Sequence, residues 1–158
     1  MATLFISGIT FSCFSQSHGT IQKGYAFFKV SLPGNIIVKN GKEIPAVPSI
    51  ERFIYLENLG EGVPKVDSVV YHGIPVGISI QPAGGSPVTV GINKSNGRKV
   101  ILAAHKGNSL WKIILQEING HRTGSLKSVS LIIRQRTDSH FRNFNISRET
   151  ELSTPDSY

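Results

Sequence analysis

Apolar side chains recur at every second position along most of the chain after residue 23, and this spacing is typical of β-strands. In residues 74–81 every second position is isoleucine or valine, and the positions between them are proline, glycine, serine and glutamine. A strand with one apolar face has to bury that face against another layer. The pattern therefore predicts sheets that pack face to face, and it requires no helix.

The same alternation, interrupted by Gly, Pro and Asn turns, predicts eight or nine short strands. Asn40-Gly41, whose residues both tolerate a positive φ, is expected to be a hairpin turn, and His72-Gly73 is a second candidate. Pro45 and Pro48 limit the second arm of the first hairpin, 42–46, to an edge or a short piece. The strands are expected at 24–32, 35–39, 50–57, 66–71, 74–81, 87–92, 98–105, 109–118 and 126–135.

Residues 109–118 have apolar side chains on both faces, so we expect a central strand that is buried on each side, with Trp111 in the core. A short helix is the rival interpretation for this segment and for 50–57. The β-branched and aromatic residues of both segments favour strands.

These elements predict an all-β fold, an antiparallel β-sandwich of the immunoglobulin-like or jelly-roll-like type, in residues 18–136. The alternation ends after Arg136. Residues 137–158 are polar and are expected to form a loosely ordered tail that docks around 141–146.

Residues 1–17 carry no charged side chain, and their apolar stretch is followed by Ser and Gln, which is the layout of a secretory signal peptide. The usual basic segment is missing, so we interpret 1–17 as a truncated signal peptide and expect export to the periplasm, the cell surface or the medium. The alternative is a first β-strand of the mature fold, which would make the protein cytoplasmic. No apolar run reaches the roughly 18 residues that span a bilayer, so an integral membrane protein is not expected.

Few residues are arranged for chemistry. The single cysteine excludes a disulfide framework and a cysteine-based zinc cluster, and the five histidines have no metal-ligand spacing. We therefore assign no catalytic, cofactor-binding or metal-binding residue. The alternative, a small hydrolase or isomerase on a β scaffold, would need His72, His105 or His121 to converge with a carboxylate in one pocket.

The chain has 17 Lys and Arg against 10 Asp and Glu, a formal net charge of +7. The densest basic group is Arg134, Arg136, Arg142 and Arg148, interleaved with Phe141 and Phe144 among other residues. Arginines between aromatic residues can bind an anionic polymer or a nucleic acid, and we interpret these four as an anion-binding group. No nucleic-acid-binding motif accompanies them, so an anionic polymer or a protein partner at the cell envelope is the preferred ligand.

These features together predict an exported, non-catalytic β-sandwich that serves as a binding or structural module of the cell envelope. The ligand is not specified by the sequence.

Overall fold

The computed structural model describes residues 20–31, 37–39, 41–44, 48–116, 130–137 and 140–153. Within these ranges every regular element is a strand, which confirms the all-β prediction. No helix among the described residues has the length and hydropathy to cross a membrane. Residues 1–17, and with them the predicted signal peptide, lie outside the described ranges.

The strands follow the chain in thirteen segments. They are β1 (Ile21–Ser31), β2 (Ile37–Lys39), β3 (Lys42–Ile44), β4 (Ser49–Leu59), β5 (Val66–Tyr71), β6 (Ile74–Val76), β7 (Ile78–Pro82), β8 (Val88–Ile92), β9 (Lys99–Leu102), β10 (Asn108–Leu115), β11 (Leu131–Arg136), β12 (Phe141–Ile146) and β13 (Glu149–Leu152).

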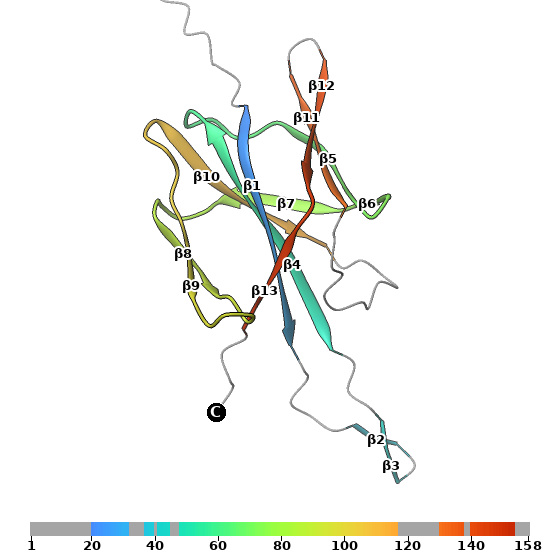
Figure 1. Ribbon diagram of the computed structural model, residues 1–158. Coiled ribbons are helices and arrows are strands. Elements are labelled where there is room, and N and C mark those ends of the chain that lie inside the picture. The colour runs from blue at the N-terminus through green and yellow to red at the C-terminus, as the bar shows by residue number, and fades with distance from the viewer. Residues whose placement is uncertain are drawn as a thin grey trace, which may run out of the picture.

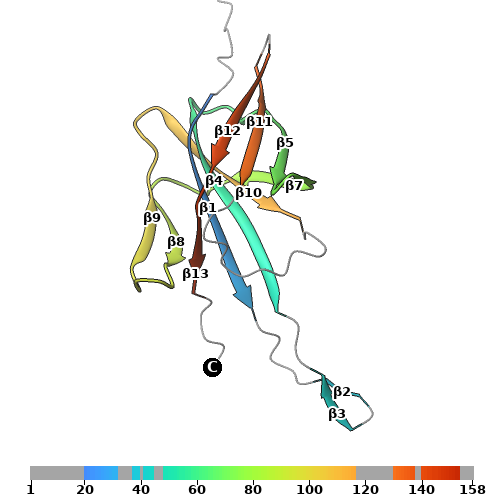
Figure 2. The same cartoon turned by 45° about the vertical axis from the view of Figure 1, so that its right-hand side comes forward.

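The strands form two main sheets and two hairpins. The five-stranded sheet has the order β13-β1-β4-β10-β7, and the four-stranded sheet has the order β12-β11-β5-β6. Neighbouring strands are antiparallel except β13, which runs parallel to β1. The β8–β9 hairpin lies on one side of β4 and the four-stranded sheet lies on the other, while the β2–β3 hairpin projects beyond β1 and β4 (Figures 1 and 2). The fold is thus a sandwich with a third, smaller layer.

Strand β4 is buried on both of its faces because it lies between these layers. Ile54 and Leu56 are fully buried in a core that the four-stranded sheet completes. Phe53 and Tyr55 point the other way, into a second core that the β8–β9 hairpin covers. The alternation of β4 therefore contributes apolar side chains to two separate cores.

The predicted central strand 109–118 is a strand in its described part, but β4 has the more complete two-sided burial. In β10, Trp111 is only half-buried, and its indole Nε1 donates a hydrogen bond to Ser109 Oγ at 3.0 Å. On the other face, Lys112 Nζ lies 4.4 Å from the centre of the Phe53 ring. The placement of Trp111 in the core was wrong, because the side chains that β10 contributes to the two cores are those of Leu110, Ile113 and Leu115.

The segment 74–81, predicted as one strand, is divided at Gly77 between the two sheets. β6 pairs with β5 in the four-stranded sheet, and β7 pairs with β10 in the five-stranded sheet. The Gln116 N–H donates a hydrogen bond of 2.8 Å to the Gly77 carbonyl at the crossing. The alternation continues through the crossing because Val76, Ile78 and Ile80 all pack against the same core.

Both predicted hairpin turns are present. Gly41 has φ 72°, and β2 and β3 pair on either side of the turn. His72 and Gly73 have φ 49° and 83°, and β5 and β6 pair on either side of them. Positive φ at both His72 and Gly73 gives a turn whose twist matches that of the flanking strands.

The prediction of a loosely ordered tail after Arg136 was wrong for the described part of 137–158. This part contains β12, which pairs with β11, and β13, which pairs with β1. Both strands gain their order from backbone hydrogen bonds, and each buries only one large apolar side chain, Ile146 and Leu152. Phe141, expected to anchor the tail, is 46% exposed.

Gly24 in β1 is a position where two layers approach closely. A Cβ atom built there would lie 2.7 Å from Phe144 Cε1 and 2.8 Å from Ile146 Cδ1. We expect Gly24→Ala to lower the free energy of unfolding by about 1–3 kcal/mol, because the added methyl group overpacks the core. Urea denaturation measures the change.

Gly77→Ala is the matched control for this substitution. Its Cβ would meet only the exposed side chain of Gln116, which can rotate away. The expected loss of stability is small. Equal losses for the two variants would contradict the close approach at Gly24.

Candidate functional site

Two of the four predicted anion-binding arginines share one face of the four-stranded sheet. Arg134 and Arg136 alternate in β11 with Ile133 and Gln135, which are buried, so the two arginines point outward. The Arg134 guanidinium lies 4.1 Å from the centre of the exposed Phe141 ring on β12. Within the described part of the chain neither arginine has a carboxylate partner, so both cations remain available to an anion.

The structure does not bring the other two arginines to this face. Arg142 pairs in register with Gln135, whose side chain is buried, and therefore lies on the opposite face of the sheet. Arg148 lies in the connection between β12 and β13 and lines a different hollow. The predicted group of four is thus one pair and two separate residues.

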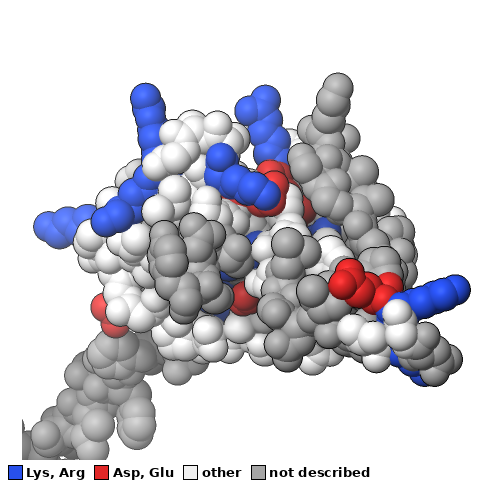
Figure 3. All heavy atoms as spheres, turned by 90° about the horizontal axis from the view of Figure 1, so that it is seen from below, with Lys and Arg blue, Asp and Glu red and all other residues white. Residues whose placement is uncertain are grey.

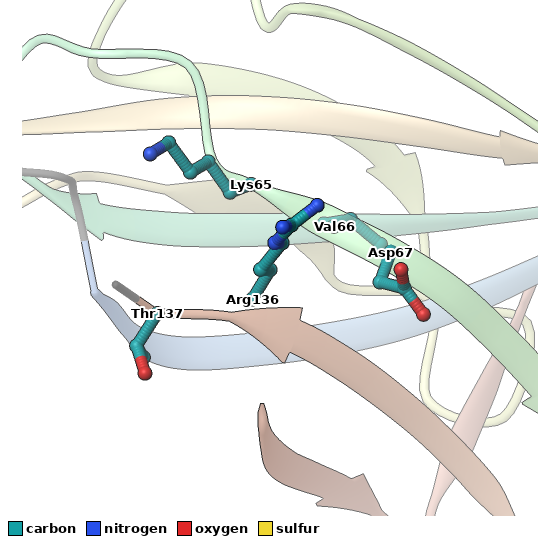
Figure 4. A pocket seen from close by; sticks show the side chains of 5 residues that line it. All are labelled: Lys65, Val66, Asp67, Arg136 and Thr137. Carbon is teal, nitrogen blue, oxygen red and sulfur yellow. The ribbon is translucent and has the colours of Figure 1, made fainter. Parts of the chain in front are cut away.

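A hollow of about 610 Å³ lies beside Arg136. Lys65, Val66, Asp67 and Thr137 line it together with Arg136, and the Arg136 N–H donates a 2.9 Å hydrogen bond to the Lys65 carbonyl. The side chains of Lys65 and Asp67 point away from one another on either side of Arg136 (Figure 4). Arg136 is therefore the central cation of this hollow.

Net positive charge does not by itself define a site. Seen from below, Lys and Arg side chains are spread around the periphery of the molecule, and they do not form one patch (Figure 3). Arg134 and Arg136 differ from these dispersed side chains because they lie on one strand, which fixes the spacing between the two cations.

A second polar cluster surrounds the carboxylate of Glu57, which is buried near the end of β4. Its Oε1 atom accepts hydrogen bonds from the His105 N–H at 2.9 Å and from Asn108 Nδ2 at 2.6 Å, and it lies 2.6 Å from His105 Nδ1. Burial alone would raise the pKa of Glu57. The backbone N–H of His105, the Asn108 amide and the His105 imidazole outweigh burial and lower this pKa to about 2.

This cluster meets one of the two requirements that we set for an enzyme. His105 converges with a carboxylate, and its side chain is 65% exposed. Neither residue, however, lines the hollows beside Arg136, Arg148 and Lys94. Two of the contacts of Glu57 go to His105 in the loop that connects β9 and β10, and the third goes to Asn108, the first residue of β10. The carboxylate therefore fixes the end of that loop to β4.

The other candidate histidines do not join this cluster. His72 lies in the β5–β6 turn, where its N–H donates a 2.7 Å hydrogen bond to the Ser130 carbonyl. His121 lies outside the described residues. In the described ranges no three His, Cys, Asp or Glu side chains are close enough together to hold a metal ion.

A third polar cluster connects three strands through Arg52, Tyr71 and Glu149. Arg52 Nε donates to the Tyr71 hydroxyl at 3.0 Å, and the hydroxyl donates to Glu149 Oε2 at 3.2 Å. Arg52 Nε also lies 3.4 Å from Glu149 Oε1. Burial raises the pKa of Glu149, and the nearby Arg52 charge and the Tyr71 hydroxyl offset part of that effect. The ion pair therefore joins β4, β5 and β13 inside the protein.

Neither polar cluster was predicted from the sequence, and Glu57, Arg52 and Glu149 were assigned no role. A usable signal was present, because Arg52 and Glu57 flank a run of apolar residues in a strand with two buried faces. A charged residue in such a place requires a partner from another element.

We expect Glu57→Gln to destabilise the protein in a pH-dependent way. The folded pKa of Glu57 is about 2, below its ordinary value of 4.5, so the stabilisation is complete above about pH 4.5 and is lost as the pH falls toward 2. At pH 7 the expected loss is on the order of 2–3 kcal/mol. Chemical denaturation of both proteins between pH 2 and 7 measures the difference.

Glu51→Gln is the control, because Glu51 lies on the same strand and is exposed. It should leave the unfolding free energy almost unchanged at pH 7. If the difference in unfolding free energy between the wild-type protein and Glu57→Gln stays constant down to pH 2, the role of the Glu57 charge is contradicted.

We expect Arg52→Met and Glu149→Met each to lower the free energy of unfolding by about 3–5 kcal/mol, since each leaves a buried charge without its partner. The double variant should lose much less than the sum of the single changes. A double-mutant cycle by urea denaturation at pH 7 measures this coupling. Additive losses would show that the pair does not act as a unit.

Comparison with protein-family models, with curated proteins and with solved structures gives no match for this chain. The function therefore has to be argued from the geometry of the described residues.

Proposed function

We propose that this protein is an exported, non-catalytic module of the cell envelope that binds an acidic polysaccharide on the outer face of its four-stranded sheet. The observation that supports this most directly is the pair formed by Arg134 and Arg136. These two exposed cations lie on the same face of one strand, and Arg136 lines a hollow.

The pair has the rigidity that a binding site needs. Residues two apart in a strand are separated by about 7 Å, and the backbone of β11 is held by β12 on one side and β5 on the other. Since Arg134 also stacks on Phe141, its guanidinium is positioned before a ligand arrives. An anionic chain that crosses β11 can therefore contact both cations without ordering a loop.

The same face favours a polysaccharide over a nucleic acid. Proteins that bind single strands place several aromatic rings along a basic groove so that successive bases can stack. Phe141 is the one exposed aromatic side chain described on this sheet, and Arg134 already covers its ring. The interaction that remains is charge pairing with carboxylate or sulfate groups.

The proposal of export is supported by the uncharged, apolar residues 1–17. Its non-catalytic part is supported by the place of the Glu57 cluster, since Glu57 and His105 line neither the hollow beside Arg136 nor the one beside Arg148.

The test is a titration of the protein with polygalacturonate at NaCl concentrations between about 50 and 300 mM, in which calorimetry measures the binding. We expect saturable binding that weakens with salt. The double variant Arg134→Gln/Arg136→Gln should lose at least about tenfold in affinity, because two charge-assisted contacts are removed.

Arg98→Gln/Lys99→Gln is the matched control. It also removes two positive charges, but from the β8–β9 hairpin on the other side of β4. An equal loss in this control would show that net charge, and not the Arg134–Arg136 pair, causes binding. Tighter binding of a single-stranded oligonucleotide than of polygalacturonate would contradict the proposed ligand class.

A further inference from the structure

A second hollow, of about 510 Å³, lies in the angle between the β8–β9 hairpin and the edge of β1. Strand β13 pairs with β1 only from Ala26 to Lys29. The part of the β1 edge that precedes Ala26 is therefore not covered by β13. The connection from β12 to β13 forms the other wall. Residues of β1, β9, β12 and β13 line the hollow together with Asn93 and the β12–β13 connection.

Backbone hydrogen bonds fix the walls of this hollow. The end of the β8–β9 hairpin is joined to β13 by the Lys94 N–H, which donates to the Glu151 carbonyl at 3.0 Å, and by the Ser153 N–H, which donates to the Ile92 carbonyl at 2.8 Å. Lys94 Nζ also contacts Glu151 Oε1 at 2.6 Å. The hollow is therefore formed before a ligand binds, which lowers the entropic cost of binding.

The lining combines apolar and polar groups in the way that a sugar requires. Phe27, Val100 and Leu102 belong to the second core and give the hollow an apolar base. Tyr25 is 37% exposed and adds an aromatic ring at the side. The C–H face of a sugar ring packs against surfaces of this kind.

The polar groups suit the hydroxyls of the same ligand. Asn93 and Asn145 supply amides, and Ser147 and Thr150 supply hydroxyls. The Asn93 side-chain oxygen accepts hydrogen bonds from Ser95 N and Ser95 Oγ at 2.9 and 2.8 Å, which orients its amide NH2 group as a donor.

Arg148 determines the charge of the ligand. It is the one charged side chain among the described lining residues, and no carboxylate lies beside it there. A guanidinium binds a carboxylate through two parallel hydrogen bonds. We propose that this hollow is a second binding site, which takes a single acidic sugar of the uronate class with its carboxylate on Arg148. The site is distinct from the Arg134–Arg136 pair, because neither of those arginines lines this hollow.

The test is a separate titration of the ¹⁵N-labelled full chain with D-glucuronate, D-glucose and acetate. Changes in the amide chemical shifts measure the binding. The chain is produced in a bacterial host that leaves Asn93 and Asn145, each part of an Asn-x-Ser sequence, without glycans. With glucuronate we expect saturable shifts at Gly24, Tyr25, Asn93 and Thr150. Glucose and acetate should bind at least about fivefold more weakly, because glucose lacks the carboxylate and acetate lacks the sugar ring.

Arg148→Gln should weaken glucuronate binding by about tenfold, because it removes the charge-assisted contact. Arg142→Gln is the matched control, since Arg142 lies on the neighbouring strand and does not line the hollow. Arg134→Gln/Arg136→Gln should also bind glucuronate normally, which separates this site from the polysaccharide face.

Three results would overturn the inference. They are the absence of saturable shifts with glucuronate, equal binding of glucuronate and acetate, and unchanged affinity in Arg148→Gln. Unchanged spectra of the free variants show that each is folded, so a loss of binding reports on the contact and not on the fold.

Discussion

The burial of β4 on both faces is the constraint on which the rest of the structure depends. Its apolar side chains point alternately into two cores, and neither core closes without a layer from elsewhere in the chain. Arg52 and Glu57 lie at the two ends of the apolar run, and burial would cost several kcal/mol for either charge without a partner. Arg52 therefore requires β5 and β13, and Glu57 requires the loop after β9 up to the first residue of β10. The partners that these two buried charges of β4 require thus determine where three other segments of the chain lie.

Much of the fold could be predicted because strand alternation and turn residues are local signals. The described strands between 24 and 115 agree with the predicted ranges apart from their ends and the division of 74–81 at Gly77, and the turns at Gly41 and His72-Gly73 are present. The change of sheet at Gly77 could not be predicted, because alternation records which face is buried and not which neighbour pairs. The strands of the C-terminal segment were missed because edge strands are held by backbone hydrogen bonds, which leave little trace in the sequence.

For the candidate sites too, positions close together in the sequence could be related to one another, whereas contacts between distant segments could not. Arg134 and Arg136 could be placed together because they are two apart in one strand. Arg142 was grouped with them by proximity in sequence, and the pairing register with β11 puts it on the other face. The hollow beside Arg148 combines β1, β9 and the β12–β13 connection. No local pattern could have predicted it, because its walls come from opposite ends of the chain.

The parallel pairing of β13 with β1 affects how the protein can be made. β1 begins at Ile21, whereas the strand that completes its sheet ends at Leu152, so this sheet stays unfinished on the ribosome until almost all of the described chain has emerged. Contacts between segments so distant in sequence form slowly, because a long loop must close first. During that interval the edge of β1 is open to pairing with other nascent chains, and a chaperone that shields it would raise the yield of folded protein.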